Sequence, residues 1–185
     1  EFIMADNSRR AFSLANPPHQ GLLELHLRLI EGGKFTQFVF NEMKEKSIHR
    51  IEAPIGQFYL RESEKPIVFV AGGTGFAPIK SVIEDLIFNN IKRPIFLYRG
   101  AGSFEDLYMH DLAKNWANKI NEFSYIPVSE KIPKNNDQLR IGLVHHAVLE
   151  DFKSLANVQV YCCGAPGLVQ TAFESFTKKG LPEDE

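Results

Sequence analysis

The segment that most constrains the fold is PIVFVAGGTGFAP, residues 66–78, which predicts a strand, a glycine cluster and a helix start. The run up to Ala71 is continuously apolar, as in a strand that is covered on both faces of a parallel sheet. Gly72, Gly73 and Gly75 leave the backbone bare, and Pro78 suits the first turn of a helix predicted over 77–88. Free N–H groups at such a helix start favour an anion, such as a pyrophosphate.

This glycine cluster matches neither of the two best-known nucleotide-binding loops. Lys80-Ser81 would end a P-loop, but Ile79 stands where that motif requires glycine. In a dinucleotide-binding fingerprint the third glycine would stand where the chain has Pro78. A tight strand-to-helix turn also uses glycine and proline without binding a ligand, although three glycines exceed what a turn needs. A nucleotide loop of another kind is therefore the prediction, and a plain turn is the alternative.

Residues 65–185 continue as strands that alternate with helices. The pattern predicts strands over 94–98, 123–128 and 158–163, helices over 104–117, 143–152 and 167–179, and a polar loop over 129–140. Such alternation indicates a parallel sheet with helices on both faces. The segment VQVYCCGAPGLV, residues 158–169, repeats the order of strand, glycine and helix. If its strand neighbours the first one, two glycine corners flank one crevice, which is the geometry of a dinucleotide site.

Residues 1–58 have a different period and predict a small antiparallel sheet. Residues 1–4 and 9–15 flank a polar turn, as in a hairpin, and residues 48–56 predict a further short strand. The segment LLELHLRLI, residues 22–30, alternates leucines with polar residues and predicts another strand. Residues 35–46 have helical spacing. The polar segment 59–66 forms the junction between the two parts.

Composition and charge exclude several classes of function. A formal net charge of −2 gives no bulk attraction to nucleic acid or to an anionic membrane, and no apolar run reaches the length of a membrane span. The two cysteines, Cys162 and Cys163, are too few for an iron–sulfur cluster or a structural zinc site. Two adjacent cysteines cannot form a framework of disulfides, which favours a reducing, cytoplasmic location. The histidines suggest no metal site, and His145 and His146 are expected to face solvent or to cap a helix.

Five segments in order, RAFSLAN, GGKFTQFV, APIGQF, AGGTGFAP and VYCCGAPG, resemble the ferredoxin–NADP reductase superfamily. Within it the match resembles oxygenase reductase components and the CDP-6-deoxy-Δ3,4-glucoseen reductase group. The resemblance implies an α/β chain with a partial antiparallel FAD-binding β-barrel over 1–58 and a parallel doubly wound NAD(P)-binding domain over 65–185. It also implies a fragment. Further barrel strands and a 2Fe–2S domain would precede Glu1, and an aromatic residue that covers the flavin would follow Glu185.

The activity that the resemblance implies is that of an NAD(P)H-dependent flavoprotein reductase. A hydride passes to bound FAD, and electrons then pass to an iron–sulfur centre or an acceptor protein, with no nucleic-acid or membrane partner. A free-flavin reductase and a non-catalytic nucleotide-binding module remain alternatives. The fragment is expected to hold FAD poorly and to be inactive alone.

The resemblance also assigns residues to the flavin. Arg10 would bind the FAD pyrophosphate, because a guanidinium fits phosphate oxygens with two hydrogen bonds. Phe12 would stack on the flavin, Ser13 would reach its N5 edge, and the segment Leu14, Ala15 and Asn16 would face the pyrimidine side. A second group would offer amides and a hydroxyl to the same pyrophosphate: Gly32, Gly33, Lys34, Phe35 and Thr36.

On the nicotinamide side, the resemblance places Thr74 and Cys163 beside the hydride path, together with Ser13 as the catalytic contacts. The residues that would shape the two corners are Gly72, Gly73, Gly75, Pro78, Gly164 and Pro166. Arg99 would contact the adenosine end. Gly102 stands where the family often has an arginine, and no basic cluster follows that strand, which favours NADH over NADPH.

Overall fold

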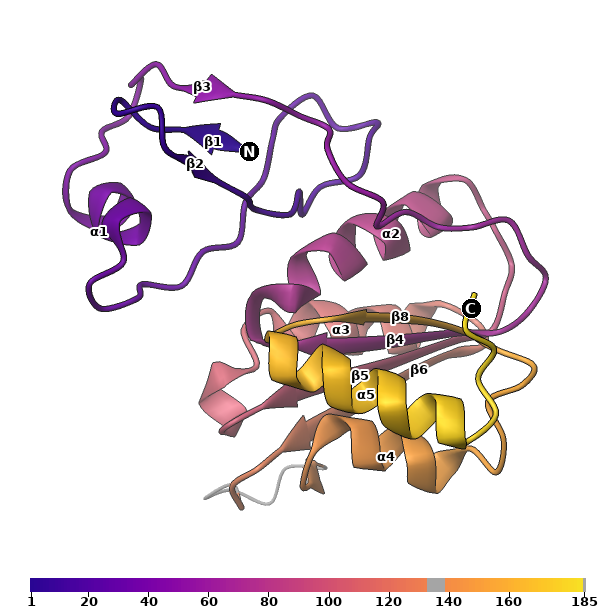
Figure 1. Cartoon of the computed structure of the whole chain (residues 1–185). Coiled ribbons are helices and arrows are strands. Elements are labelled where there is room, and N and C mark those ends of the chain that lie inside the picture. Colours follow the sequence, from indigo (N-terminus) through magenta and orange to yellow (C-terminus); the bar gives the residue numbers. More distant parts are fainter. Residues whose placement is uncertain (133–138, 185) are drawn as a thin grey trace.

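The computed structural model describes residues 1–132 and 139–184, which form a larger part built on a parallel sheet and a smaller part beside it (Figure 1). The predicted polar loop over 129–140 lies partly outside the described residues. No helix among the described residues is long and apolar enough to cross a membrane.

The parallel sheet has the strand order β7-β6-β5-β4-β8. Its strands are β4 (Ile67–Gly72), β5 (Ile95–Ala101), β6 (Phe123–Ser129), β7 (Arg140–Ile141) and β8 (Gln159–Cys163). The chain moves outward from β4 to β7 and then returns to place β8 on the other side of β4. The strand order therefore reverses between β4 and β8, which confirms the predicted doubly wound sheet.

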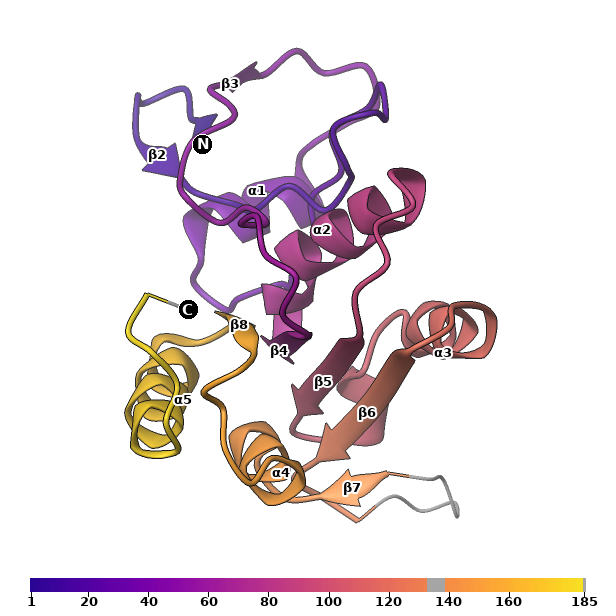
Figure 2. The same cartoon turned by 90° about the vertical axis from the view of Figure 1, so that its right-hand side faces the viewer.

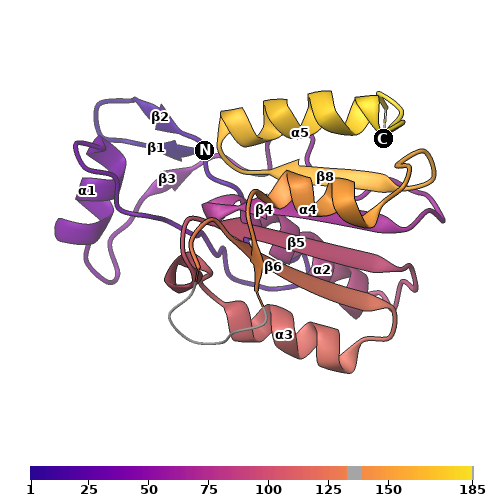
Figure 3. The ribbon, with the colours of Figure 1, turned by 90° about the horizontal axis from the view of Figure 1, so that it is seen from below.

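Helices cover both faces of this sheet. Helices α2 (Phe76–Phe88) and α3 (His110–Lys119) pack on one face, and α4 (Val144–Asp151) and α5 (Pro166–Lys178) pack on the other (Figure 1). Seen from below, α5 runs beside β8 and α3 beside β6 (Figure 3). Along β4, Ile67, Phe69 and Ala71 enter the core under α2, whereas Val68 and Val70 enter the core under α5. Burial on both faces explains the continuous apolar run.

The helix predicted over 104–117 is wrong in its first half. A short 3₁₀ turn, Phe104–Asp106, comes first, and Met109 is left-handed with φ 55° before α3 begins at His110. The carbonyl oxygen of Tyr108 accepts a hydrogen bond from the buried Arg99 side chain, at 2.7 Å. The carbonyl of Tyr108 is therefore engaged by a side chain two residues before α3 begins.

The smaller part contains a sheet of order β2-β1-β3 and one helix. Its strands are β1 (Phe2–Ile3), β2 (Arg9–Arg10) and β3 (Arg50–Ile51), all antiparallel, and helix α1 spans Lys34–Asn41. The hairpin of β1 and β2 agrees with the prediction, but α1 ends five residues before the predicted end of that helix. The short strand predicted over 48–56 is reduced to the two residues that pair with β1.

The strand predicted over 22–30 is also wrong. Only one bridge forms, between Leu14 and Leu25, and Leu23 remains 57% exposed. The polar residues of the alternation, Glu24 and His26, instead bond to side chains of the larger part. Their partners lie on α2 and just before α3, and α2 lies on the side of the larger part that faces the smaller part (Figure 2).

Candidate functional site

A cavity of about 1300 Å³ lies at the carboxyl edge of the sheet, where β4 and β8 are neighbours. Both parts of the chain contribute to its wall. The smaller part supplies Ala11, Phe12, Ser13, Glu24, His26, Leu27 and Arg28. The larger part supplies the two glycine corners and the residues that follow β5 and β6. Ligands of open parallel sheets bind at this kind of edge, where the strand order reverses.

The two glycine corners touch each other, as the sequence predicted. A Cβ atom added to Gly75 would lie 2.1 Å from the carbonyl oxygen of Cys163 and 2.7 Å from the nitrogen of Gly164. A Cβ atom on Gly164 would lie 3.2 Å from the Cα atom of Gly72. Only glycine permits this approach, so the corners after β4 and β8 form one wall of the cavity.

The first corner has the properties of an anion cradle. Gly73 has φ +52°, and no atom lies within 4 Å of a Cβ atom added to it. The corner leads through a 3₁₀ turn into α2, a helix of 13 residues with no acidic side chain in its first turn. The start of a helix without acidic side chains has a positive dipole end that favours a group with negative charge. Pro78 and Pro166 both lie in the first turns of their helices, and neither lines the cavity.

The three residues predicted as catalytic, Ser13, Thr74 and Cys163, all line this cavity. Burial raises the pKa of Cys163, although a hydrogen bond from the N–H of Gly164 partly offsets it. Burial, and then the neighbouring Cys163, raise the pKa of Cys162 to about 12. Both thiols are therefore protonated near neutral pH, which suits a contact residue and not a nucleophile.

Only part of the predicted flavin-side segment lines the same cavity: Phe12 and Ser13 do, whereas Arg10, Leu14, Ala15 and Asn16 do not. Phe12 lines it and packs on Phe35 with ring centroids 4.7 Å apart. The guanidinium of Arg10 donates to the carbonyl of Arg9, on the exposed strand β2. Asn16 is buried: its side-chain oxygen accepts from the N–H of Glu24 at 2.7 Å, and its amide donates to the carbonyl of Pro17. The backbone carbonyl of Asn16 also has a partner, because it accepts a hydrogen bond from the hydroxyl of Ser81.

The second predicted flavin group surrounds the start of α1 and does not line the cavity. Gly32 has φ +72°, and Gly33 is the residue that precedes the helix. The hydroxyl of Thr36 bonds to the backbone of Ile30 and Gly33, and its contact with a pyrophosphate stays a prediction. Lys34 forms an ion pair with Asp6 across the part's surface, and Phe35 is 3% exposed.

The structure contradicts the assignment of Arg99 to the adenosine end. Its side chain is 2% exposed, and its guanidinium carbon lies 3.7 Å from the centre of the Phe76 ring. Burial lowers its pKa. The alternation along β5 explains this position, because Arg99 shares a face with Ile95 and Leu97, both core residues. The Arg99 guanidinium packs against the ring of Phe76, the first residue of α2, and Arg99 does not line the cavity.

His145 lines the cavity, whereas the sequence interpretation expected it to face solvent or to cap a helix. It is 6% exposed, it lines the cavity, and its Nδ1 atom has no hydrogen-bond partner among the described residues. Burial, and then the neighbouring His146, lower its pKa, so it is neutral at pH 7. The second histidine of the pair, His146, is exposed as predicted.

Acidic side chains also line the cavity beyond the ends of β5 and β6, and the sequence interpretation did not include them. They are Glu105, Asp106 and Glu130. Among the residues that the structure describes, no group of three His, Cys, Asp or Glu side chains is arranged to hold a metal ion.

Comparison with known proteins identifies both parts. Residues 2–59 match the family described as oxidoreductase FAD-binding domain, and residues 69–174 match the oxidoreductase NAD-binding domain. The chain is 40% identical to the CDP-6-deoxy-L-threo-D-glycero-4-hexulose-3-dehydrase reductase of Yersinia pestis over 99% of this chain and 55% of that protein. It is 34% identical to the NAD(P)H-flavin reductase of Vibrio harveyi over 99% of this chain and 80% of that protein.

Among solved structures, the cytochrome P450 reductase GcoB of Amycolatopsis superposes with a TM-score of 0.90 at 26% identity, over 99% of this chain and 56% of that one. The chain thus spans about half the length of several reductases that it resembles. Both domain matches and this fold agree with the architecture described above. The chain belongs to the ferredoxin–NADP reductase superfamily, the oxidoreductases that pair an FAD-binding domain with an NAD-binding domain.

Proposed function

We propose that the chain is the reductase part of a flavoprotein that takes a hydride from NADH and delivers electrons to an iron–sulfur centre or acceptor protein. One observation carries the proposal. The two glycine corners and residues Ala11, Phe12 and Ser13 line a single cavity of about 1300 Å³. In this cavity the first glycine corner would bind a pyrophosphate, and Phe12 would stack on a second, aromatic ligand. The domain boundary proposed here is residues 59–66, with the FAD-binding part before it and the NAD-binding part after it.

The chain's own residues would bind, orient and shield the two ligands. When bound, NADH supplies a hydride, and FAD accepts it and releases its electrons one at a time. Gly72–Gly75 would hold the dinucleotide pyrophosphate by backbone N–H groups. Thr74 and the neutral thiol of Cys163 would flank the nicotinamide, and Ser13 would face it from the flavin side. Arg10 and the amide of Gly32 would hold the pyrophosphate of FAD. Neither residue lines the cavity, and the N–H of Gly33 donates to the carbonyl of Ile30 at 3.0 Å.

The acidic rim of the cavity supports NADH over NADPH. Glu105, Asp106 and Glu130 lie beyond the ends of β5 and β6, and Gly102 stands among them. A 2′-phosphate would bring a further negative charge next to these carboxylates, and position 102 offers it a glycine in place of an arginine. Arg99 does not supply that arginine, because it is buried under Phe76.

The electron acceptor is proposed from analogy with relatives and not from the site. The similarity to a hexulose dehydrase reductase favours an iron–sulfur partner in deoxysugar metabolism. The chain covers 80% of the NAD(P)H-flavin reductase of Vibrio harveyi. This similarity supports a second candidate function, in which flavin is a substrate that is released after reduction.

An NADH titration of the full chain, followed by amide NMR signals, tests the proposal. We expect shifts at Gly72–Gly75 and at Cys163–Gly164. Stopped-flow absorbance at 450 nm, with saturating FAD present, then measures flavin reduction by NADH. In a protein that also supplies the remaining predicted barrel strands, flavin that remains bound through gel filtration would favour the electron-transfer role, and flavin that is reduced and released would favour the second candidate. If NADH perturbs neither glycine corner, the proposed function is wrong.

A further inference from the structure

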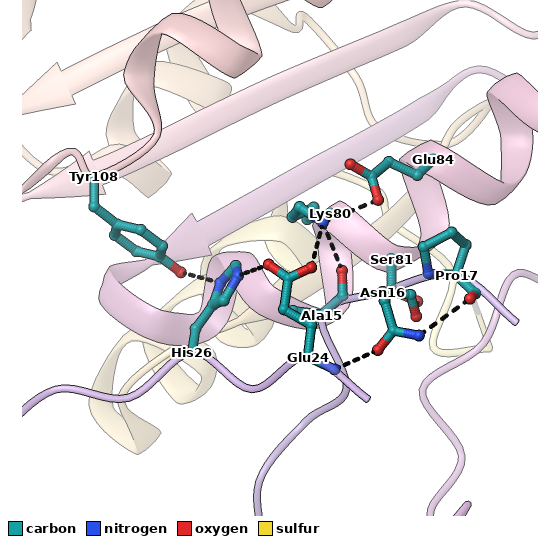
Figure 4. A network of polar contacts seen from close by, with 9 residues as sticks. All are labelled: Ala15, Asn16, Pro17, Glu24, His26, Lys80, Ser81, Glu84 and Tyr108. Atoms are coloured by element: carbon teal, nitrogen blue, oxygen red, sulfur yellow. Dashed lines mark hydrogen bonds and ion pairs between the residues drawn. The ribbon is translucent and has the colours of Figure 1, made fainter. Parts of the chain in front are cut away.

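A buried ammonium group connects the two parts of the chain beside the cavity. Lys80 lies on α2, a short distance after the first glycine corner, and its side chain is 5% exposed. Its Nζ atom donates to the carbonyl of Ala15 at 3.1 Å, to Glu24 Oε2 at 3.0 Å and to Glu84 Oε2 at 2.9 Å (Figure 4). An ammonium group has three donors, so each donor has an acceptor. Two of the three acceptors belong to the smaller part.

The next residue of α2 makes the same connection. The hydroxyl of Ser81 donates to the carbonyl of Asn16 at 2.8 Å. Consecutive residues of one helix thus hold consecutive carbonyls, those of Ala15 and Asn16, in the segment that begins at Ser13. That segment is also tied to its neighbouring chain, because the N–H of Ala15 donates to the carbonyl of Glu24 at 2.8 Å.

The network continues from Glu24 to the wall of the cavity. Glu24 Oε1 lies 2.8 Å from His26 Nε2, and His26 Nδ1 lies 2.8 Å from the hydroxyl of Tyr108 (Figure 4). Burial alone would raise the pKa of Glu24, but hydrogen bonds from His26 and Lys80 together bring it below its usual value. Glu24 is therefore a carboxylate at neutral pH. Glu24, His26 and Tyr108 all line the cavity, so the network extends from α2 to the ligand space.

We propose that Lys80 and Glu24 are positioning residues that fix the flavin-side segment 13–16 against helix α2. The inference rests on the proposed function, because it concerns the distance between the two ligands of that site. Ser13 begins the segment that Lys80 holds, and Thr74 lies in the corner from which α2 starts. A rotation of one part against the other would change the separation of Ser13 and Thr74. Such small displacements matter because hydride transfer needs close, aligned atoms.

A second contact between the parts supplies a matched control. Asp85 is also on α2, and its carboxylate lies 3.9 Å from His19 Nδ1, with both side chains partly exposed. At that distance and exposure the pair contributes little. Asp85→Asn therefore removes a charge from the same helix and the same interface but leaves the Lys80 contacts in place.

The experiment compares the chain of residues 1–185 with its variants Lys80→Met, Glu24→Gln and Asp85→Asn. Saturating FAD and NADH are used in stopped-flow measurements at 450 nm, and NADH affinity is measured separately by calorimetry. We expect Lys80→Met to slow flavin reduction about 10- to 100-fold while the Kd for NADH changes less than about threefold. The double variant with Glu24→Gln should be no slower than the slower single variant, because both changes remove one interaction. Lys80→Arg should restore part of the rate.

A second readout does not depend on flavin. Amide residual dipolar couplings report the orientation of the two parts in the ligand-free chain. Lys80→Met should change the couplings of residues 13–25 relative to those of residues 67–101, and Asp85→Asn should not. If the wild-type chain reduces flavin and Lys80→Met matches it in rate and in couplings, the positioning role is wrong. If the wild-type chain binds no NADH, the proposed function fails, and the role in hydride transfer fails with it.

Discussion

Gly75 lies against the carbonyl group of Cys163 so closely that a Cβ atom on Gly75 would be 2.1 Å from that oxygen. The two residues are far apart in sequence, yet β4 and β8 pair directly, with Ala71 opposite Cys163. The contact therefore fixes the geometry of both glycine corners at once. It also makes Gly75 a test of the whole site that does not alter any polar side chain.

Gly75→Ala should weaken NADH binding at least about tenfold and destabilise the fold by about 1–3 kcal/mol, because the added methyl group must displace the Cys163 backbone. Calorimetric titration with NADH and thermal unfolding measure the two effects. Gly21→Ala is the control, since no atom lies within 4 Å of a Cβ atom at that position. Equal behaviour of the two variants would contradict a shared corner.

Cys163 should react slowly with iodoacetamide at pH 7, because burial raises the pKa of its thiol and the thiolate is the reactive form. The rate should reach half its maximum only above the usual thiol value of about 8.5, because the raised pKa shifts thiolate formation to higher pH. NADH should protect Cys163 more than Cys162, since Cys163 lines the cavity and Cys162 does not. Peptide mass spectrometry after timed alkylation distinguishes the two thiols, and protection of neither would count against the nicotinamide contact.

Strong local patterns predicted the larger part well. The apolar run of β4 and the glycines after it are enough to predict a buried strand followed by a tight turn. The strand β8 is followed by a glycine and a helix in the same way. The sequence could not show that Arg99 turns inward, because an arginine near a strand end equally suits the surface. Its partners, Phe76 and the carbonyl of Tyr108, are tertiary contacts. The same holds for His145, whose burial depends on the packing of α4 against the sheet.

The smaller part was predicted less accurately for a related reason. The alternation around Glu24 and His26 is that of a strand, but the polar residues find partners on α2 and in Tyr108. These long-range bonds compete with strand pairing, and only the Leu14–Leu25 bridge remains. A periodicity describes which side chains share a face and does not identify the group that the polar face will meet.

Gly102→Arg should increase the ratio of NADPH to NADH efficiency, measured as kcat/KM in flavin reduction, by about tenfold. An arginine there would offset the negative charges of Glu105, Asp106 and Glu130 and pair with a 2′-phosphate. The position tolerates a side chain, because the nearest atom to a Cβ atom would be 3.7 Å away. Gly102→Gln, of similar length and without charge, should leave the ratio unchanged. A wild-type chain that prefers NADPH would contradict the acidic-rim argument.

The NAD-binding part should fold without the smaller part, since both of its core clusters are built from residues 67–181. A chain of residues 59–185 retains Leu60, which packs on the first cluster, and the bond from the N–H of Arg61 to the hydroxyl of Tyr161. Its thermal unfolding should be a single transition, and NADH should raise the midpoint. A chain that stays unfolded would show that the contacts of Lys80 and Ser81 are needed for folding.

The ion pair between Arg140 and Asp151, the last residue of α4, should make the free energy of unfolding fall in acid. Asp151 accepts hydrogen bonds from Arg140 Nη2 and from the hydroxyl of Tyr98, both at 2.7 Å. Hydrogen bonding to Arg140 is the main cause that lowers the pKa of Asp151; burial opposes the shift, and the bond from Tyr98 reinforces it. The folded state therefore binds the proton more weakly than the unfolded chain. The stabilisation is present above the unfolded value of about 3.9 and is lost as the pH falls through the lower folded value.

Asp151→Asn should accordingly cost about 1 kcal/mol at pH 7, a figure that allows for the partial exposure of the pair. The difference from wild type should shrink towards pH 3, because below about 3.9 the unfolded wild-type chain binds a proton that the native Asp151 carboxylate binds more weakly. Urea unfolding at both pH values measures this. Glu150→Gln is the control: its carboxylate is 3.4 Å from Arg140 but 66% exposed, so its effect should be small at either pH. An Asp151→Asn effect that is constant with pH would show that the hydrogen bonds, and not the charge, carry the stabilisation.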